Sequence, residues 1–362
     1  MLAQSKLNTP QDASFAAFKA DHDDVVHDVE YDYYGKHIAT CSSDQRIKVW
    51  RLKEASAVDA EMTPEWTTVD SWKAHDGSIA KVAWAHPEFG NVIASCSLDR
   101  TVKIWEEHEN EPLNSGRRWK LKATIADCKA MVQGIEFAPH HLGLKLATCS
   151  ADGWVRIYEA ADIMNIANWT LSGEFEAAPG SKETDQLCIS WCPSRLQPQQ
   201  LVVGCGDQNV ARIYRLNANN QWTAFEHLPK HLGQVTDVAW APNMGRSYQL
   251  IATGCKDNHV RFYKLTWEGA SKTDEAVRLA QTTAGIAKGK WRVELASSFN
   301  DHQSEVFLFC FSSFIFFALV YSDNATGLAS RLEYNWNCSF LMWAGWNRST
   351  LEINVPWGLV VL

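Results

Sequence analysis

One short element recurs along the chain and restricts its fold more than any other feature. An aspartate is followed six positions later by an aromatic residue, with alternating polar and apolar residues between them, in Asp44–Trp50, Asp99–Trp105, Asp152–Tyr158 and Asp257–Tyr263. A fifth copy, Asp207–Tyr214, carries one extra residue, which predicts a bulge or a longer turn. The copies recur at intervals of roughly 50 residues, which is typical of an array of similar structural units.

Each copy lies among segments with the composition of β-strands. Apolar runs such as 37–40 and 92–95 precede the aspartate, and a further strand-like segment opens each unit, as in 79–84, 132–137 and 235–240. No helical period separates the units, so parallel α/β folds lose support. Four-stranded blades in a radial arrangement fit best, and the sequence therefore predicts an all-β propeller of the WD-repeat type.

The units also contain histidine, a hydroxyl residue and aspartate, which are the residue types of a hydrolase triad. The sets are His22, Thr40, Asp44 and Trp50; His75, Ser95, Asp99 and Trp105; Thr148, Asp152 and Tyr158; and His231, Thr253, Asp257 and Tyr263. The third set has Asp127-Cys128 where a histidine is expected, and the fourth unit has Val203 in place of the hydroxyl residue. A catalytic triad occurs once, over a pocket, whereas this set recurs. We predict structural hydrogen-bond networks, no catalytic residues and no enzyme activity.

Composition excludes several other classes of function. The formal net charge of -8 provides no general electrostatic reason to bind nucleic acid. Residues 1–20 lack the features of a secretory signal and are interpreted as the leader of a protein made in the cytosol. The ten cysteines include no CxxC pair, so neither a disulfide framework nor a metal site is predicted. The run Gly204-Cys-Gly206 lacks the lysine of a phosphate loop, and no cofactor is expected.

The repeat fails near the C-terminus. A sixth unit opens with His302 and 304–306, but 307–321 is an apolar stretch with six phenylalanines. It is shorter than the roughly 20 residues of a membrane-spanning helix, so no anchor is expected. Residues 331–335 would continue the strand if 307 to about 330 were removed. The sequence thus predicts a leader (1–20), an open propeller with five recognisable blades and an interrupted sixth (21–306), and a retained intron or alternative tail (307–362).

Longer stretches carry a more specific resemblance. Residues 85–90 followed by 92–100 resemble the propellers shared by the Sec-type COPII coat subunit and the Seh-type nucleoporin. Residues 137–153, 155–160, 162–165 with Trp169, and 240–248 are similar to the Seh-type member in particular. The resemblance covers roughly residues 20 to 306.

The resemblance implies an open, six-bladed propeller that an α-solenoid nucleoporin completes by donating a seventh blade in trans, as strand addition at a sheet edge. It also implies membership of the Y-shaped nuclear pore scaffold and of the GATOR/SEA complex, which regulates TOR signalling. The implied roles are nucleocytoplasmic, mRNA and protein transport, and the implied locations are the nuclear envelope, the cytoplasm and the lysosomal or vacuolar surface.

The donated blade would lie beside the entry strand of blade one. We therefore expect partner contacts at Val25, Val26, Asp28, Val29 and Tyr31, the alternative being that this segment forms only an inner strand. Two rival functions remain open, a WD-repeat adaptor that recognises substrate peptides at its central channel and a COPII-type coat subunit.

Overall fold

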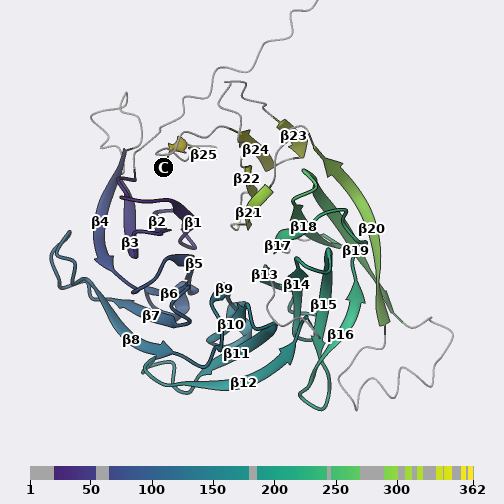
Figure 1. The fold of residues 1–362 in the computed structure, drawn as a ribbon, viewed down its shortest axis with the longest axis horizontal. Helices are drawn as coiled ribbons and strands as arrows, with labels where there is room; N and C mark the ends of the chain where they lie inside the picture. Colours follow the sequence, from purple (N-terminus) through teal and green to yellow (C-terminus); the bar gives the residue numbers. More distant parts are fainter. Residues whose placement is uncertain are drawn as a thin grey trace, which may run out of the picture.

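The computed structural model consists of four-stranded sheets that follow one another around an arc (Figure 1). It describes residues 20–53, 65–178, 186–242, 246–269 and 289–300, and beyond them the backbone of six short strands between residues 306 and 361. Residues 1–19 of the expected leader lie outside the described residues.

Five sheets are the predicted blades, each with its four strands paired antiparallel in chain order. The strands of blades one and two are β1 (Val26–Tyr31), β2 (His37–Ser42), β3 (Arg46–Lys53), β4 (Glu65–Lys73), β5 (Ile79–Trp84), β6 (Val92–Ser97), β7 (Val102–Glu107) and β8 (Trp119–Ile125). Those of blades three to five are β9 (Val132–Phe137), β10 (Lys145–Ser150), β11 (Trp154–Ala160), β12 (Trp169–Glu176), β13 (Leu187–Trp191), β14 (Gln200–Cys205), β15 (Val210–Leu216), β16 (Trp222–His227), β17 (Val235–Trp240), β18 (Gln249–Cys255), β19 (Val260–Gly269) and β20 (Gly289–Phe299).

The repeat aspartate closes the turn between the second and third strands. In blade one the carboxylate of Asp44 accepts the N–H of Arg46 at 2.9 Å, and Gln45 between them has a φ of 69°. The same bond recurs in three further blades, at Asp99, Asp152 and Asp257. Aspartate suits this turn because its side chain bonds the backbone two residues on. In blade four the extra residue produces no bulge, since β14 and β15 pair without a register shift, and the last pair, Cys205 with Val210, encloses four residues where Cys41 with Ile47 encloses five in blade one.

The first strand of each blade lies innermost, and these strands pack in chain order from β1 through β5, β9 and β13 to β17. Four clusters of buried apolar side chains fill the spaces between consecutive blades. Between blades one and two, for example, Trp72 stacks on Trp119 at 5.5 Å and meets Trp105 edge-on at 5.7 Å. Each sheet therefore buries its faces against its neighbours, as repeat proteins do.

A sheet of different topology follows blade five. Its strands are β21 (Val306–Phe311), β22 (Phe316–Val320), β24 (Cys338–Ala344) and β23 (Leu332–Trp336), in that order, and β22 pairs with β24 in parallel. β21 packs against β17 and β18, whereas no comparable packing joins it to β1 among the described strands. Residues 332–335 lie in β23, and β25 (Glu352–Val355) and β26 (Gly358–Val361) form a separate hairpin.

The predicted class, an all-β WD-repeat propeller with five regular blades, is confirmed. In the part of the chain that the structure describes, no helix is both long and apolar enough to cross a membrane.

Candidate functional site

Blade two contains a complete polar network of the predicted kind. His75 lies with its Nδ1 2.9 Å from Oδ2 of Asp99 and its Nε2 2.8 Å from Oγ of Ser95. The indole of Trp105 donates to the same hydroxyl at 3.0 Å. Burial lowers the pKa of His75, and Asp99 only partly opposes that shift. His75 and Ser95 are 1% and 0% exposed, so a substrate cannot reach them, and the network serves to satisfy buried polar groups.

Blade one repeats this arrangement. His22 bonds Asp44 at 2.7 Å and Thr40 at 2.9 Å, and Trp50 donates to Thr40 at 3.3 Å. Burial raises the pKa of Asp44, but the hydrogen bonds that it accepts from His22 and from the N–H groups of Arg46 and Asp23, together with the charge of His22, outweigh burial, and the net shift is downward. Two blades therefore hold the same set in the same geometry, which is the behaviour of a structural element.

Blade three builds its network around an arginine. The guanidinium of Arg156 donates to Asp152 at 2.9 Å, to Ser150 at 3.0 Å and to the thiol of Cys128 at 3.8 Å. Thr148 bonds only the carbonyl of Arg156, so the expected set of Thr148, Asp152 and Tyr158 is not joined as in blades one and two. Arg156 occupies the place left by the missing histidine.

Blade four has neither a histidine nor a hydroxyl residue at the network positions, as the sequence indicated. Val203 is fully buried in the apolar cluster between blades three and four. The hydroxyl of Tyr214 donates to the carbonyl of Ala177 at 3.2 Å, and Arg212 donates to the same carbonyl at 3.0 Å.

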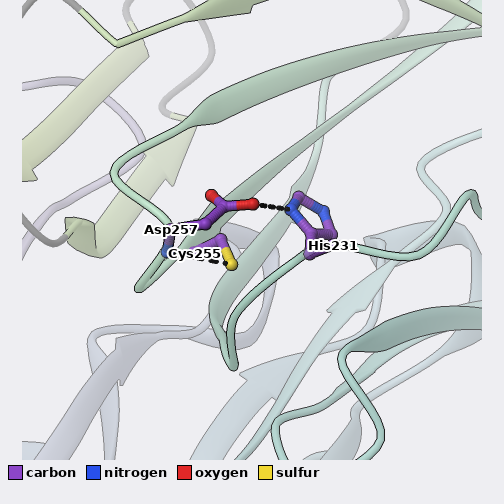
Figure 2. Close-up of side chains that lie close together, drawn as sticks. All are labelled: His231, Cys255 and Asp257. Atoms are coloured by element: carbon purple, nitrogen blue, oxygen red, sulfur yellow. Dashed lines mark hydrogen bonds and ion pairs between the residues drawn. The ribbon is translucent and has the colours of Figure 1, made fainter.

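Blade five has the residues of the network, but its histidine lies farther from the aspartate than in blades one and two (Figure 2). His231 bonds Thr253 at 2.9 Å, but its Nδ1 lies 3.7 Å from Asp257. Arg261 donates to Asp257 at 2.9 Å, and Tyr263 donates to the carbonyl of Pro229 at 3.4 Å rather than to Thr253. Burial, with Arg261 close by, lowers the pKa of His231 to about 4.

Figure 2 also shows the only group of potential metal ligands among the described residues. It consists of His231, Cys255 and Asp257, whose ligand atoms lie within 4.8 Å of one another. Structural zinc sites use four ligands, and here the cationic Arg261 already bonds the carboxylate. The thiol of Cys255 accepts the N–H of Asp257 at 3.3 Å, as the hydroxyls of Ser42 and Ser97 do in blades one and two. We therefore interpret the group as a variant of the repeat network.

A basic residue four positions after the repeat aspartate is a further element, which the sequence reasoning missed. Lys103 donates to the carbonyl of Ala74 at 2.8 Å, directly before His75, and Arg261 donates to that of Lys230 at 3.3 Å, directly before His231. The basic side chain thus anchors the segment that carries the histidine. The signal was present in the regular spacing of Lys48, Lys103, Arg156 and Arg261.

The innermost strands of consecutive blades are joined by side-chain bonds. Glu30 accepts the N–H of Trp84 at 2.8 Å, and Glu136 accepts that of Trp191 at 2.9 Å. Ser190 donates to Glu136 at 3.3 Å and accepts the N–H of Trp240 at 3.0 Å. An innermost strand is a sheet edge, and these acceptors satisfy its outward N–H groups.

Oppositely charged groups meet at the axis. The ammonium of Lys81 on β5 lies 3.2 Å from both carboxylate oxygens of Asp237 on β17. Desolvation lowers the pKa of Lys81, but Asp237 and Asp28 outweigh it and the net shift is upward. Burial raises the pKa of Asp28 to about 6. The pair links two non-adjacent blades across the centre.

The predicted partner residues lie on two sides of β1. The carboxylate of Asp28 accepts the N–H of Val82 at 3.0 Å and so faces blade two. Val29 is buried in a small cluster with Ala20, Ile38 and Trp50, against which Val26, Tyr31 and Trp66 pack half-buried. Among the described residues this cluster draws on blade one and Ala20 alone. Val25 precedes the strand and is 40% exposed.

Comparison with known proteins agrees with this geometry. The family described as WD domain, G-beta repeat matches residues 15–51, 66–106 and 222–264. These ranges contain the networks of blades one, two and five, which are the three with a histidine. Fold and networks together define a WD-repeat propeller.

Relatives narrow the class further. The nucleoporin SEH1 of Saccharomyces cerevisiae is 44% identical over 252 residues, which cover 69% of this chain and 70% of the yeast protein. That of Schizosaccharomyces pombe is 38% identical over 301 residues (82% and 86%), and that of Homo sapiens is 40% identical over 298 residues (79% and 76%). The chain belongs to the nucleoporin SEH1 family, which confirms the predicted Seh-type membership. As a WD-repeat nucleoporin it is a structural protein and not an enzyme.

Proposed function

We propose that this chain is a scaffold subunit of the nuclear pore that binds an α-solenoid nucleoporin, which supplies a further blade beside blade one. The name of its relatives, nucleoporin, supports the pore assignment. The apolar face of blade one carries the partner assignment, because Val29 lies on the side of β1 opposite Asp28, which bonds blade two, in a cluster formed by residues of blade one and Ala20.

The physical reason lies in the other blade faces. Between consecutive blades, apolar side chains from both sheets form one shared cluster. Side chains alternate along β1, so Asp28 and Glu30 bond blade two while Val29 and Tyr31 occupy the opposite face. A donated blade would cover Val26, Tyr31 and Trp66 as each blade covers its neighbour, by packing one sheet face against the next.

The proposal includes the finer assignments that the family resemblance implies. These are the Y-shaped pore complex and the GATOR/SEA complex, with their other subunits as neighbours, and roles in nucleocytoplasmic, mRNA and protein transport. The locations are the nuclear envelope, the cytoplasm and the lysosomal or vacuolar surface, with no direct binding of nucleic acid and no transmembrane anchor.

The test is co-expression with an α-solenoid nucleoporin of the same organism, followed by size-exclusion chromatography with light scattering. The variant Val26→Glu/Tyr31→Glu places charge on the face of blade one turned away from blade two, and Leu171→Glu, at a position 46% exposed on the outer strand β12, is the matched control. We expect a one-to-one complex with the wild type and the control, and its loss in the face variant at an unchanged melting temperature. A face variant that binds as tightly as the control would refute blade donation at this face.

A parallel co-purification with an α-solenoid subunit of the GATOR/SEA complex separates the two assemblies. Binding of both solenoids, in competition with each other, is expected because both would use the same face. Simultaneous binding would contradict a shared face.

A further inference from the structure

A row of aromatic side chains crosses successive blades at one end of the propeller. All first strands run in the same direction around the ring, so the turns that follow them lie at the same end. We call residues 32–37, 85–91, 138–144 and 192–199 of these turns the first-turn strip. In it Tyr34 contacts Tyr33 at 5.3 Å, Tyr33 contacts His86 at 4.7 Å, and His86 stacks on His140 at 4.4 Å, between ring centroids.

The row continues from blade three into blade four through a guanidinium, because Arg195 bonds Nε2 of His140. Tyr33 is 51% exposed, Tyr34 67%, and Leu196, next to Arg195, 89%. None of these five side chains belongs to the apolar clusters between the blades. Scattered exposed aromatic residues are ordinary, but a contiguous row over four blades is typical of an interaction surface.

The charges of the strip favour an acidic occupant. Arg195 and Arg51 each donate to an imidazole, that of His140 and of His37, rather than to a carboxylate of the described residues. The carboxylate of Asp32 is already engaged, since it accepts the N–H of Lys36 at 2.7 Å and the Nδ1–H of His37 at 2.9 Å.

Two imidazoles of the strip, those of His86 and His141, add no charge of their own at neutral pH. Burial, with His140 close by, lowers the pKa of His86. Burial, with Arg195 and His140, lowers that of His141. The rings of His86 and His141 are therefore uncharged and lie in a strip flanked by the guanidinium groups of Arg195 and Arg51, in a chain whose net charge is -8.

We propose that the first-turn strip binds an extended acidic segment of a partner protein. Its carboxylates form bidentate pairs with Arg195 and Arg51, and a proline or apolar side chain of the segment packs on Tyr33 and Tyr34. This surface is separate from the open face of blade one, so binding here does not depend on the donated blade.

Single-stranded nucleic acid also combines stacking with positive charge, but it needs a cationic groove along its backbone. The strip and its flank offer Lys36, Arg51 and Arg195 with Glu88 among them, which is too little for a run of phosphates. An acidic peptide, which needs only a few pairs, fits better.

The test uses the full chain and fluorescence anisotropy with three labelled probes, a peptide of Glu-Pro-Leu repeats, a peptide of Lys-Pro-Leu repeats and an oligouridylate. We expect only the glutamate peptide to bind. Arg195→Glu should weaken that binding at least about tenfold and give the lysine peptide measurable affinity, since reversing a charge reverses the preference. Tyr33→Ala/Tyr34→Ala should weaken it comparably.

The matched control is Leu232→Ala, which removes a side chain 85% exposed in the loop before β17, at the opposite end of the propeller. It should leave binding unchanged. Because Tyr33, Tyr34 and Arg195 are exposed, these variants should melt at the wild-type temperature. The proposal is overturned if the glutamate peptide does not bind, if oligouridylate binds more tightly, or if Arg195→Glu behaves like the control.

Discussion

Replacing Lys81 with methionine removes the charge that links blades two and five while keeping an apolar stem of similar length. The ammonium lies 3.2 Å from both oxygens of Asp237, whose side chain is 1% exposed. At an effective dielectric of about 20, charges at that distance attract by about 5 kcal/mol before desolvation is subtracted. Removing one partner of a buried pair costs about 3 to 5 kcal/mol, because the other charge stays buried without its opposite charge. This is a large share of a typical stability of about 5 to 15 kcal/mol.

The assay is urea unfolding at neutral pH, followed by tryptophan fluorescence. Lys81→Met should lower the midpoint strongly, and Lys81→Met/Asp237→Leu should recover much of the loss because neither charge remains. The control is Lys73→Met, whose ammonium pairs with the exposed Asp76 at 2.9 Å and should leave the midpoint unchanged. The reasoning fails if Lys81→Met resembles Lys73→Met, or if the double variant loses the sum of the two single losses.

Three further predictions follow from the same structure. His75→Ala should lower the free energy of unfolding by about 1 to 3 kcal/mol, because it leaves the buried groups of the network without partners; unchanged stability in urea would contradict a structural role. The melting temperature should rise as the pH falls from about 8.5 to about 6.5, because desolvation raises the pKa of Glu136 to about 8 and the folded state binds a proton that the unfolded state lacks. That contribution is lost as pH rises through the folded pKa, and Glu136→Gln should abolish it, so an equal slope in both proteins would sink the assignment. Sequencing the transcript across codons 300 to 340 should reveal a mature message without the segment from 307 to about 330, and a message that keeps it in every tissue would refute the retained-intron interpretation.

The blades could be predicted from sequence because their signals are local. In four blades the aspartate of the hairpin bonds a backbone group two residues away, and in these four its spacing from the closing aromatic is the same. The histidine of blades one and two lies more than twenty residues before its aspartate, yet it was found because the whole set recurs.

The bonds between blades could not be predicted, because they depend on how the units are placed around the ring. Glu30 and Trp84 are 54 residues apart and meet only when β1 and β5 lie side by side. A single glutamate in a strand otherwise indicates a solvated face. Asp28 illustrates the same limit, since sequence placed it with Val29 at the partner edge, whereas alternation along β1 turns its carboxylate toward blade two. Arg156 was missed because strand alternation alone accounts for a basic residue there.

The bonds of the innermost strands also bear on how a scaffold responds to force. Each blade is a separate hydrogen-bonded sheet, and neighbouring sheets are held together by side chains such as those of Glu136 and Ser190 and by their apolar clusters. A force applied across the ring would therefore act on these interfaces one after another and leave the backbone hydrogen bonds within each sheet intact. The interfaces between blades should separate one at a time, with each blade still folded.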